Sequence, residues 1–180
     1  MTTVTVEEDG ASKNLLMRVA VVLLLLSVTT SAQPKVLEFR GMRAGMTREA
    51  FAAAIANLAK DQGSKGTPEC IPAAQHTLCM WGAYGAMLSD NQVFEITYKI
   101  PLLERPISGF VKVFTQKYGK PIVQRRSYRN GLGATFAGEV FVWHLHTQSL
   151  EVAEICSEID EPCVRLADPR LMKEGPPPPI

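Results

Sequence analysis

The chain has 180 residues, enough for one domain of ordinary size or two smaller halves. Its 46% hydrophobic and 21% charged residues are typical of a globular protein and argue against a disordered chain. A net charge of +1 is too small for a protein that binds nucleic acid by neutralising phosphates, so we expect no nucleic-acid partner.

Residues 1–32 have the pattern of a secretory signal peptide. Lys13 and Arg18 precede an apolar run, and small residues ending at Ala32 follow it. The run is about half of the roughly 20 residues that a membrane-spanning helix needs. We therefore expect cleavage and a periplasmic or secreted mature chain.

Two questions about this segment stay open. The alternative to cleavage is a retained signal that anchors the chain in the inner membrane by residues 15–28, which would be its membrane contact. Translation can begin at Met1 or at Met17, because Met17 and Arg18 directly before the apolar run make a more compact signal.

The stretch Gly45-Met46-Thr47-Arg48-Glu49 predicts the start of a helix. The Thr47 hydroxyl can accept a hydrogen bond from a first-turn backbone N–H, and Glu49 suits the helix dipole. Met46 and Phe51 have the spacing of a hydrophobic staple. Apolar residues continue at helical spacing until the glycines near residues 63–66, and a short edge strand is expected before the helix, over Val36–Phe39.

The rest of the chain alternates in the same way. Strands are expected near Trp81 and over residues 93–100, and a second helix with Ser108 as its N-cap ends at Gly119. Further strands are expected over residues 122–128, 134–147, 150–156 and 163–167. The Pro-rich tail, residues 173–180, is expected to lie outside the packed domain.

The four cysteines all follow the signal, and their number is even. In an oxidising compartment this favours two disulfides. The pairing Cys70–Cys79 and Cys156–Cys163 is favoured because each bond closes a short loop. A four-cysteine zinc site is the rival interpretation, but the spacings do not match zinc knuckles.

The order helix, strands, helix, strands predicts an α+β fold with two helices on one face of an antiparallel sheet. The exported domain is expected over residues 33–172. It divides into two tandem halves, at about 33–103 and 104–172, each with a local disulfide.

The Gly45–Arg48 motif after an apolar segment resembles the opening of the SmpA/OmlA-type outer-membrane assembly lipoproteins. Two such units in tandem, each with a local disulfide, are similar to the secreted beta-lactamase inhibitor protein. The resemblance covers most of residues 36–170 and implies the fold. The chain lacks the acylated cysteine of the lipoproteins, so their membrane anchor is not implied.

No nucleophile motif, phosphate loop or dinucleotide fingerprint is present, so we expect no catalytic residue and no cofactor. His144 and His146 alternate on an expected strand and therefore share a face, with Glu154 on the next strand as a third candidate metal ligand. Two histidines on a solvated sheet face are the simpler interpretation of the pair.

Charge is unevenly distributed. Residues 105–129 carry seven basic and no acidic side chains, and residues 138–162 carry six acidic and no Lys or Arg. The two blocks can neutralise each other across neighbouring strands. Alternatively, Arg125, Arg126 and Arg129 contribute to a docking surface for a partner.

These observations favour an exported, non-enzymatic protein that binds another envelope or secreted protein, for example a secreted hydrolase that it inhibits. A metal-dependent hydrolase that uses His144, His146 and Glu154 is one alternative. A small-ligand carrier is the other.

The disulfide prediction can be tested on the exported protein. Alkylation of the unreduced, denatured chain is expected to label no thiol, because all four cysteines are bonded, and prior reduction serves as the control by exposing four. Labelling of four thiols without reduction would contradict both the disulfides and the oxidising compartment.

Overall fold

The computed structural model describes residues 36–129, 132–156 and 161–172, which all belong to one unit of the chain, Lys35–Ile180. The signal peptide expected at residues 1–32 and the tail expected at 173–180 lie outside the described residues. Within them, no helix combines the length and the apolar character that crossing a membrane requires.

The predicted α+β class is confirmed. The elements in chain order are α2 (Arg48–Asp61), β1 (Glu69–Ala73), β2 (His76–Trp81), β3 (Tyr84–Ser89), β4 (Gln92–Lys99), the 3-10 helix η1 (Leu102–Glu104), α3 (Ser108–Tyr118), β5 (Ile122–Arg129), β6 (Thr135–Leu145), β7 (Gln148–Ala153), β8 (Cys163–Ala167) and the 3-10 helix η2 (Pro169–Leu171).

The strands form one antiparallel sheet in the order β1-β2-β3-β4-β8-β7-β6-β5. Each half of the domain is therefore a helix followed by a four-stranded meander, α2 with β1–β4 and α3 with β5–β8. The last strands of the two halves, β4 and β8, pair in the middle and join the meanders. The first strands, β1 and β5, become the two edges of the sheet.

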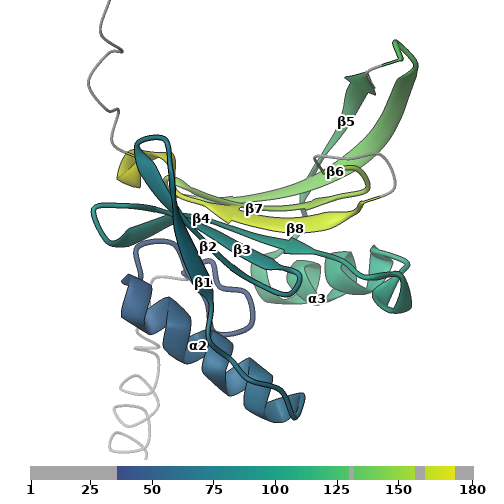
Figure 1. Ribbon diagram of the computed structural model, residues 1–180. Coiled ribbons are helices and arrows are strands. Elements are labelled where there is room, and N and C mark those ends of the chain that lie inside the picture. Colours follow the sequence, from purple (N-terminus) through teal and green to yellow (C-terminus); the bar gives the residue numbers. More distant parts are fainter. Residues whose placement is uncertain (1–35, 130–131, 157–160, 173–180) are drawn as a thin grey trace, which may run out of the picture. The chain divides into compact units, whose positions relative to one another are not determined.

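Both helices lie on the same face of the sheet (Figure 1). One row of paired residues across the sheet shows which side chains the two helices cover. Side chains directly opposite each other on paired strands share a face, and all six members of this row are buried: Cys79, Ala86, Ile96, Leu166, Leu150 and Trp143. Phe51 and Ile55 of α2 and Phe114 of α3 belong to the same core cluster.

The segment before α2 differs from its prediction. Val36–Phe39 is not a strand, because Phe39 and Met42 instead pair across a two-residue turn formed by Arg40 and Gly41. Both turn residues have positive φ, 50° and 78°, as a tight hairpin turn requires. The turn buries Phe39 and Met42 in the core and turns Arg40 outward to the cluster described below.

The predicted start of α2 is confirmed. The Thr47 hydroxyl accepts a hydrogen bond from the backbone N–H of Ala50 at 3.3 Å. Gly45, with φ of 85°, donates to the Val93 carbonyl, and Val93 donates back to Met46. The Gly-Met-Thr stretch therefore both caps α2 and attaches it to the beginning of β4.

The end of α2 is closed by glycine. Gly63 has φ of 66°, its N–H donates to the Lys60 carbonyl, and the Ser64 N–H donates to the Ala59 carbonyl. These two bonds form a Schellman motif, which satisfies carbonyls that the helix end leaves without partners.

The prediction that Ser108 caps α3 is wrong. Ser108 is the first helical residue, and Ile107, which has no polar side chain, occupies the cap position without a side-chain hydrogen bond. The predicted end of α3 is confirmed, because Gly119, with φ of 90°, is its C-cap. A serine near the start of a helix is typical of an N-cap in sequence, but here the helix begins at Ser108 itself, so its hydroxyl is one position too late to cap.

The two helix starts give a matched pair of variants. Thr47→Ala should lower the free energy of unfolding by about 1 kcal/mol, because an Ala50 N–H loses its acceptor. Ser108→Ala is the control and should change it by less than about 0.5 kcal/mol. Urea unfolding followed by circular dichroism measures both, and equal effects would contradict the capping assignment.

Candidate functional site

The structure does not bring the candidate metal ligands together. His144 is exposed and lies opposite Ser149, whereas His146 is in the turn after β6, with φ of 54°, and not on the strand. The predicted strand over residues 134–147 is therefore too long, and its two histidines do not alternate on one face.

Glu154 lies elsewhere on the same hairpin. Its backbone N–H donates to the Glu139 carbonyl, and its carboxylate accepts from the Glu139 N–H at 2.7 Å. Glu139 is five positions before His144 along β6, so the carboxylate is far from the imidazole along the strand. Among residues 36–129, 132–156 and 161–172, no three His, Cys, Asp or Glu side chains are arranged to hold a metal.

Both predicted disulfides form, and no cysteine is free. Cys70 and Cys79 are direct neighbours on the hairpin of β1 and β2, and Cys79 is buried on the face that the helices cover. Cys156–Cys163 joins the segment after β7 to the start of β8. The two bonds occupy different places in the two halves, so they are not copies of one another.

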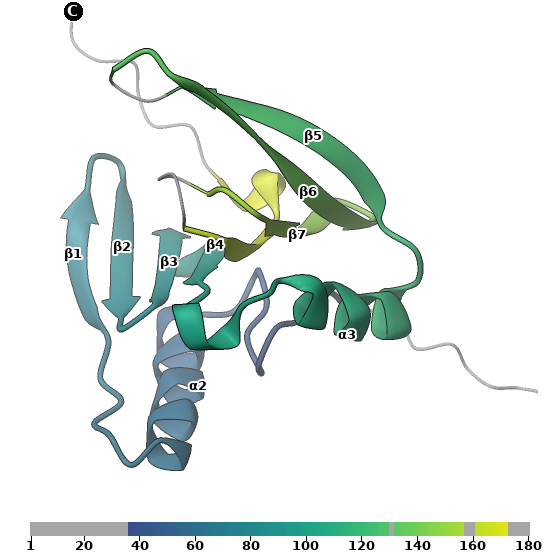
Figure 2. The same cartoon turned by 90° about the vertical axis from the view of Figure 1, so that its right-hand side faces the viewer.

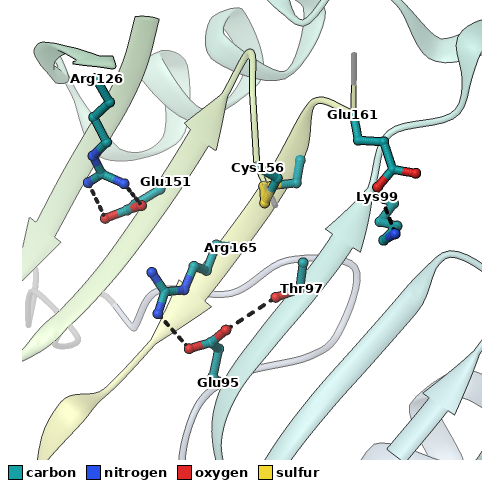
Figure 3. The surroundings of a disulfide bond; sticks show 9 residues. Glu95, Thr97, Lys99, Arg126, Glu151, Cys156, Glu161 and Arg165 are labelled. Carbon is teal, nitrogen blue, oxygen red and sulfur yellow. Dashed lines mark hydrogen bonds and ion pairs between the residues drawn. A yellow bond between two sulfur atoms is a disulfide. The ribbon is translucent and has the colours of Figure 1, made fainter. Parts of the chain in front are cut away.

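The face of the sheet away from the helices carries a row of charges (Figure 3). Arg126 on β5 donates two hydrogen bonds of 3.0 Å to the Glu151 carboxylate on β7. Arg165 on β8 donates at 2.6 Å to Glu95 on β4. Lys99 pairs with Glu161 at 2.6 Å. Opposite charges thus alternate across the middle of the sheet.

The Arg126–Glu151 pair crosses a strand. Because β6 lies between β5 and β7, the Arg126 side chain must pass over β6 to reach Glu151. Val140 and Val142 of β6 point to this face and are nevertheless buried. The arginine stem and the Cys156–Cys163 bond therefore cover this small second core.

These contacts also set the protonation equilibria of the arginines. Hydrogen bonds to Glu151 raise the pKa of Arg126, and hydrogen bonds to Glu95 raise the pKa of Arg165 against the opposing effect of burial. Both guanidinium groups stay charged and their hydrogen bonds orient them. The predicted neutralisation of the two charge blocks across strands is seen in the Arg126–Glu151 pair, whereas Glu95, Lys99 and Arg165 lie outside both blocks.

Beside the charges lies an apolar area on β1, β2 and β3. In register, Ile71 lies opposite Leu78, Leu78 opposite Met87, and Met87 opposite Glu95, so this row passes from apolar to charged residues on one face. Ile71 and Met80 are 40% and 42% exposed. We call Ile71, Leu78, Met80 and Met87 the apolar area, and the whole face the uncovered face, since no described helix packs on it.

A second candidate is a surface pocket of about 490 Å³ beside α3. Its lining includes four apolar side chains, Phe39, Phe110, Val113 and Phe114, of which Val113 is 57% exposed. Cavities of this size hold small ligands in other proteins. The pocket is open to solvent, and charged side chains from Glu38, Arg40, Glu104 and Lys117 stand around it.

Arg40 at the rim of this pocket belongs to a cluster that sequence reasoning missed. Its guanidinium donates to the Tyr84 hydroxyl and, at 3.0 Å, to Glu104, and it lies over the rings of Phe39 and Tyr98. The Tyr98 hydroxyl donates to Glu104 at 2.7 Å. The only sequence signal was Arg40-Gly41 between apolar residues, which is compatible with a two-residue turn.

Burial has opposite effects on the groups of this cluster. Burial raises the pKa of Tyr98, and the hydrogen bond to Glu104 raises it further. Burial alone would lower the pKa of Arg40, but the hydrogen bond with Tyr84 and the nearby Glu104 outweigh it and raise the pKa. The cluster therefore holds one ion pair and two neutral tyrosines at neutral pH, and it fastens the turn of Arg40 to η1.

The three arginines proposed for partner binding all lie on β5. Arg126 is committed to Glu151, and the Arg129 side chain donates to the Gly133 carbonyl at 3.3 Å. Arg125 is exposed, with no ion pair within 4.0 Å among the described residues. The three side chains do not form one basic patch, because Arg125 and Arg129 lie on one face of β5 and Arg126 lies on the other.

Comparisons with known proteins do not identify a relative. No protein-family model, curated protein or solved structure matches the chain.

Neighbouring arginines on β5 test the charge row. Arg126→Ala should lower the free energy of unfolding by about 1 kcal/mol, because Glu151 loses its partner and Val140 loses its cover, with solvent screening limiting the effect. Arg125→Ala, the control, should change it by less than about 0.5 kcal/mol. Thermal and urea unfolding measure both free energies. Equal losses in the two variants would contradict the assignment of a stabilising role to Arg126.

Proposed function

We propose that the protein is an exported, non-enzymatic protein that binds another envelope or secreted protein through the uncovered face of its sheet. The observation that carries the proposal is the composition of this face. An apolar area with two exposed side chains, Ile71 and Met80, lies next to the ion pairs Arg126–Glu151 and Arg165–Glu95.

Such a surface suits a protein partner for two physical reasons. Methionine and isoleucine side chains supply apolar area that becomes buried on association, and methionine adapts its shape to the partner. The neighbouring charges have fixed positions, because Arg165 and Arg126 are held by carboxylates, and fixed charges favour one partner orientation over others.

Export is supported by the two disulfides, which persist in oxidising compartments. The signal-like pattern of residues 1–32 agrees with this, and the mature chain is then periplasmic or secreted. The resemblance to the assembly lipoproteins and to the tandem inhibitor protein points in the same direction. One form of the proposed activity is inhibition of a secreted hydrolase.

A small-ligand carrier is the second candidate, and the pocket beside α3 favours it. Native mass spectrometry of the protein purified from its own compartment would separate the candidates. A carrier is expected to retain a small molecule, and Val113→Glu, which places a charge in the apolar lining, is expected to weaken that retention.

Site-specific photo-crosslinking in cells tests the main proposal. A photoreactive residue at Met80 or Met87 is expected to give one recurrent crosslinked protein, because these side chains would lie in the interface. The same residue at Lys112, which is exposed on α3 and therefore on the other side of the sheet, is the control and should not give that product.

Two results would contradict the proposal. One is the same crosslinked product from Lys112 as from Met80, since this would indicate contact without a preferred face. The other is the absence of any product from Met80 and Met87 while the protein is abundant, disulfide-bonded and folded.

A further inference from the structure

The two edges of the sheet differ in how well they are protected. An edge strand presents unpaired backbone N–H and C=O groups, to which another chain can add a strand. The β1 edge has five residues and contains Pro72, which lacks an N–H, and Cys70 within it is bonded to Cys79. A short strand with proline is a common way to block such pairing.

The β5 edge lacks these protections. It has eight residues, contains no proline, and pairs along its whole length with β6. Its position at the end of the strand order leaves its other side without a partner strand among the described residues. Ile122 and Val123 are 56% and 53% exposed, so neither face of this strand is covered at its start.

The outer half of the hairpin also lacks a third strand. Residues 140–145 of β6 pair with β7, but residues 135–139 pair in the ladder only with β5. Figures 1 and 2 show β5 and β6 extending together past their neighbours. A two-stranded ribbon is only marginally stable alone, and a third strand would stabilise it.

We propose that β5 is a docking site for an extended, acidic segment of a partner protein, which adds to the sheet as a ninth, antiparallel strand. The inference rests on the proposed function in that it assumes a protein partner, but it names a second site, because β5 lies at the opposite end of the strand order from the apolar area. Main-chain hydrogen bonds to β5 supply the affinity, and side chains on alternate positions supply the selection.

Charge defines the occupant. Arg125 and Arg129 share one face of β5, since they are four residues apart, and no acidic residue lies within the strand. Glu139 of β6 lies opposite Arg125, and no ion pair within 4.0 Å joins these two residues. Val123 follows on the same face. A matching antiparallel strand carries acidic residues opposite Arg129 and Arg125 and an apolar residue opposite Val123. Arg126 points to the other face and keeps its bond to Glu151.

A second copy of this chain fits β5 poorly. If two β5 strands pair antiparallel about a two-fold axis, residues that lie opposite each other must have their side chains on the same face of the sheet. The two registers that pair nearly the whole strand then place Arg125 opposite Arg125 of the copy, or Arg126 opposite Arg126. Like charges directly opposite each other destabilise a strand pair, which favours an acidic segment of another protein.

The experiment uses the intact mature protein and a defined probe, the peptide acetyl-Glu-Val-Thr-Thr-Glu-Thr-Val-Val-amide. At a peptide concentration ten times its dissociation constant, the β5 amides that point away from β6 should exchange their hydrogens about tenfold more slowly. The inward amides already pair with β6, so the added protection should fall on alternate residues of β5. Residue-resolved hydrogen exchange by NMR measures this.

Three controls separate strand addition from general attraction. A peptide with Lys in place of both Glu residues should bind at least about tenfold more weakly. A peptide N-methylated at alternate residues should give no protection, because it cannot donate to β5. The Arg125→Glu, Arg129→Glu double variant should weaken binding about tenfold, whereas Lys112→Glu, the same charge change on α3, should leave it unchanged.

The possible outcomes are distinct. No protection at millimolar peptide, equal binding of the Lys or N-methylated peptide, or protection that does not alternate along β5 would each overturn the strand-docking inference. If Met80 and Met87 still crosslink to one partner in that case, the proposed function stands without it. Protection by the peptide with no crosslinked partner in cells would instead overturn the proposed function and leave the β5 site.

Discussion

The pairing of β4 with β8 is the constraint on which the rest of the structure depends. These two strands end the two halves of the domain, and their five register pairs join two meanders into one sheet. Ile96 and Leu166, which face each other in this pairing, are both buried under the helices. Without this pairing, each half would present a four-stranded sheet with an apolar edge strand, and its core would be half as wide.

The pairing also determines what the two faces can do. On one face, a row from Cys79 to Trp143 continues through β4 and β8 and forms a single core below α2 and α3. On the other face, the same pairing brings Glu95 beside Arg165 and places the apolar area next to the charge row. The surface proposed to bind a partner therefore contains residues of both halves, and neither half carries it alone.

The same topology places the first strand of each half at an edge. Because β4 and β8 occupy the centre, β1 and β5 lie at the ends of the strand order. Pro72 and the Cys70–Cys79 bond limit the first edge, and β5 has no equivalent feature. The approximate symmetry of the halves is thus broken where a partner could add a strand.

The sequence by itself determined the local features: the α+β class, the cap at Thr47, the glycine ends of both helices and the two disulfides, because each depends on neighbouring residues. Two sequence predictions, a cap at Ser108 and a strand that continues through His146, are wrong. A hydroxyl residue does not fix where a helix begins, and alternating residue types do not fix where a strand ends. Only the tertiary structure decided that Arg126 pairs with Glu151, that Arg40 reaches Glu104, and that β5 is an edge. Those contacts join residues far apart in the chain, and strand order, which no local pattern encodes, brings them together.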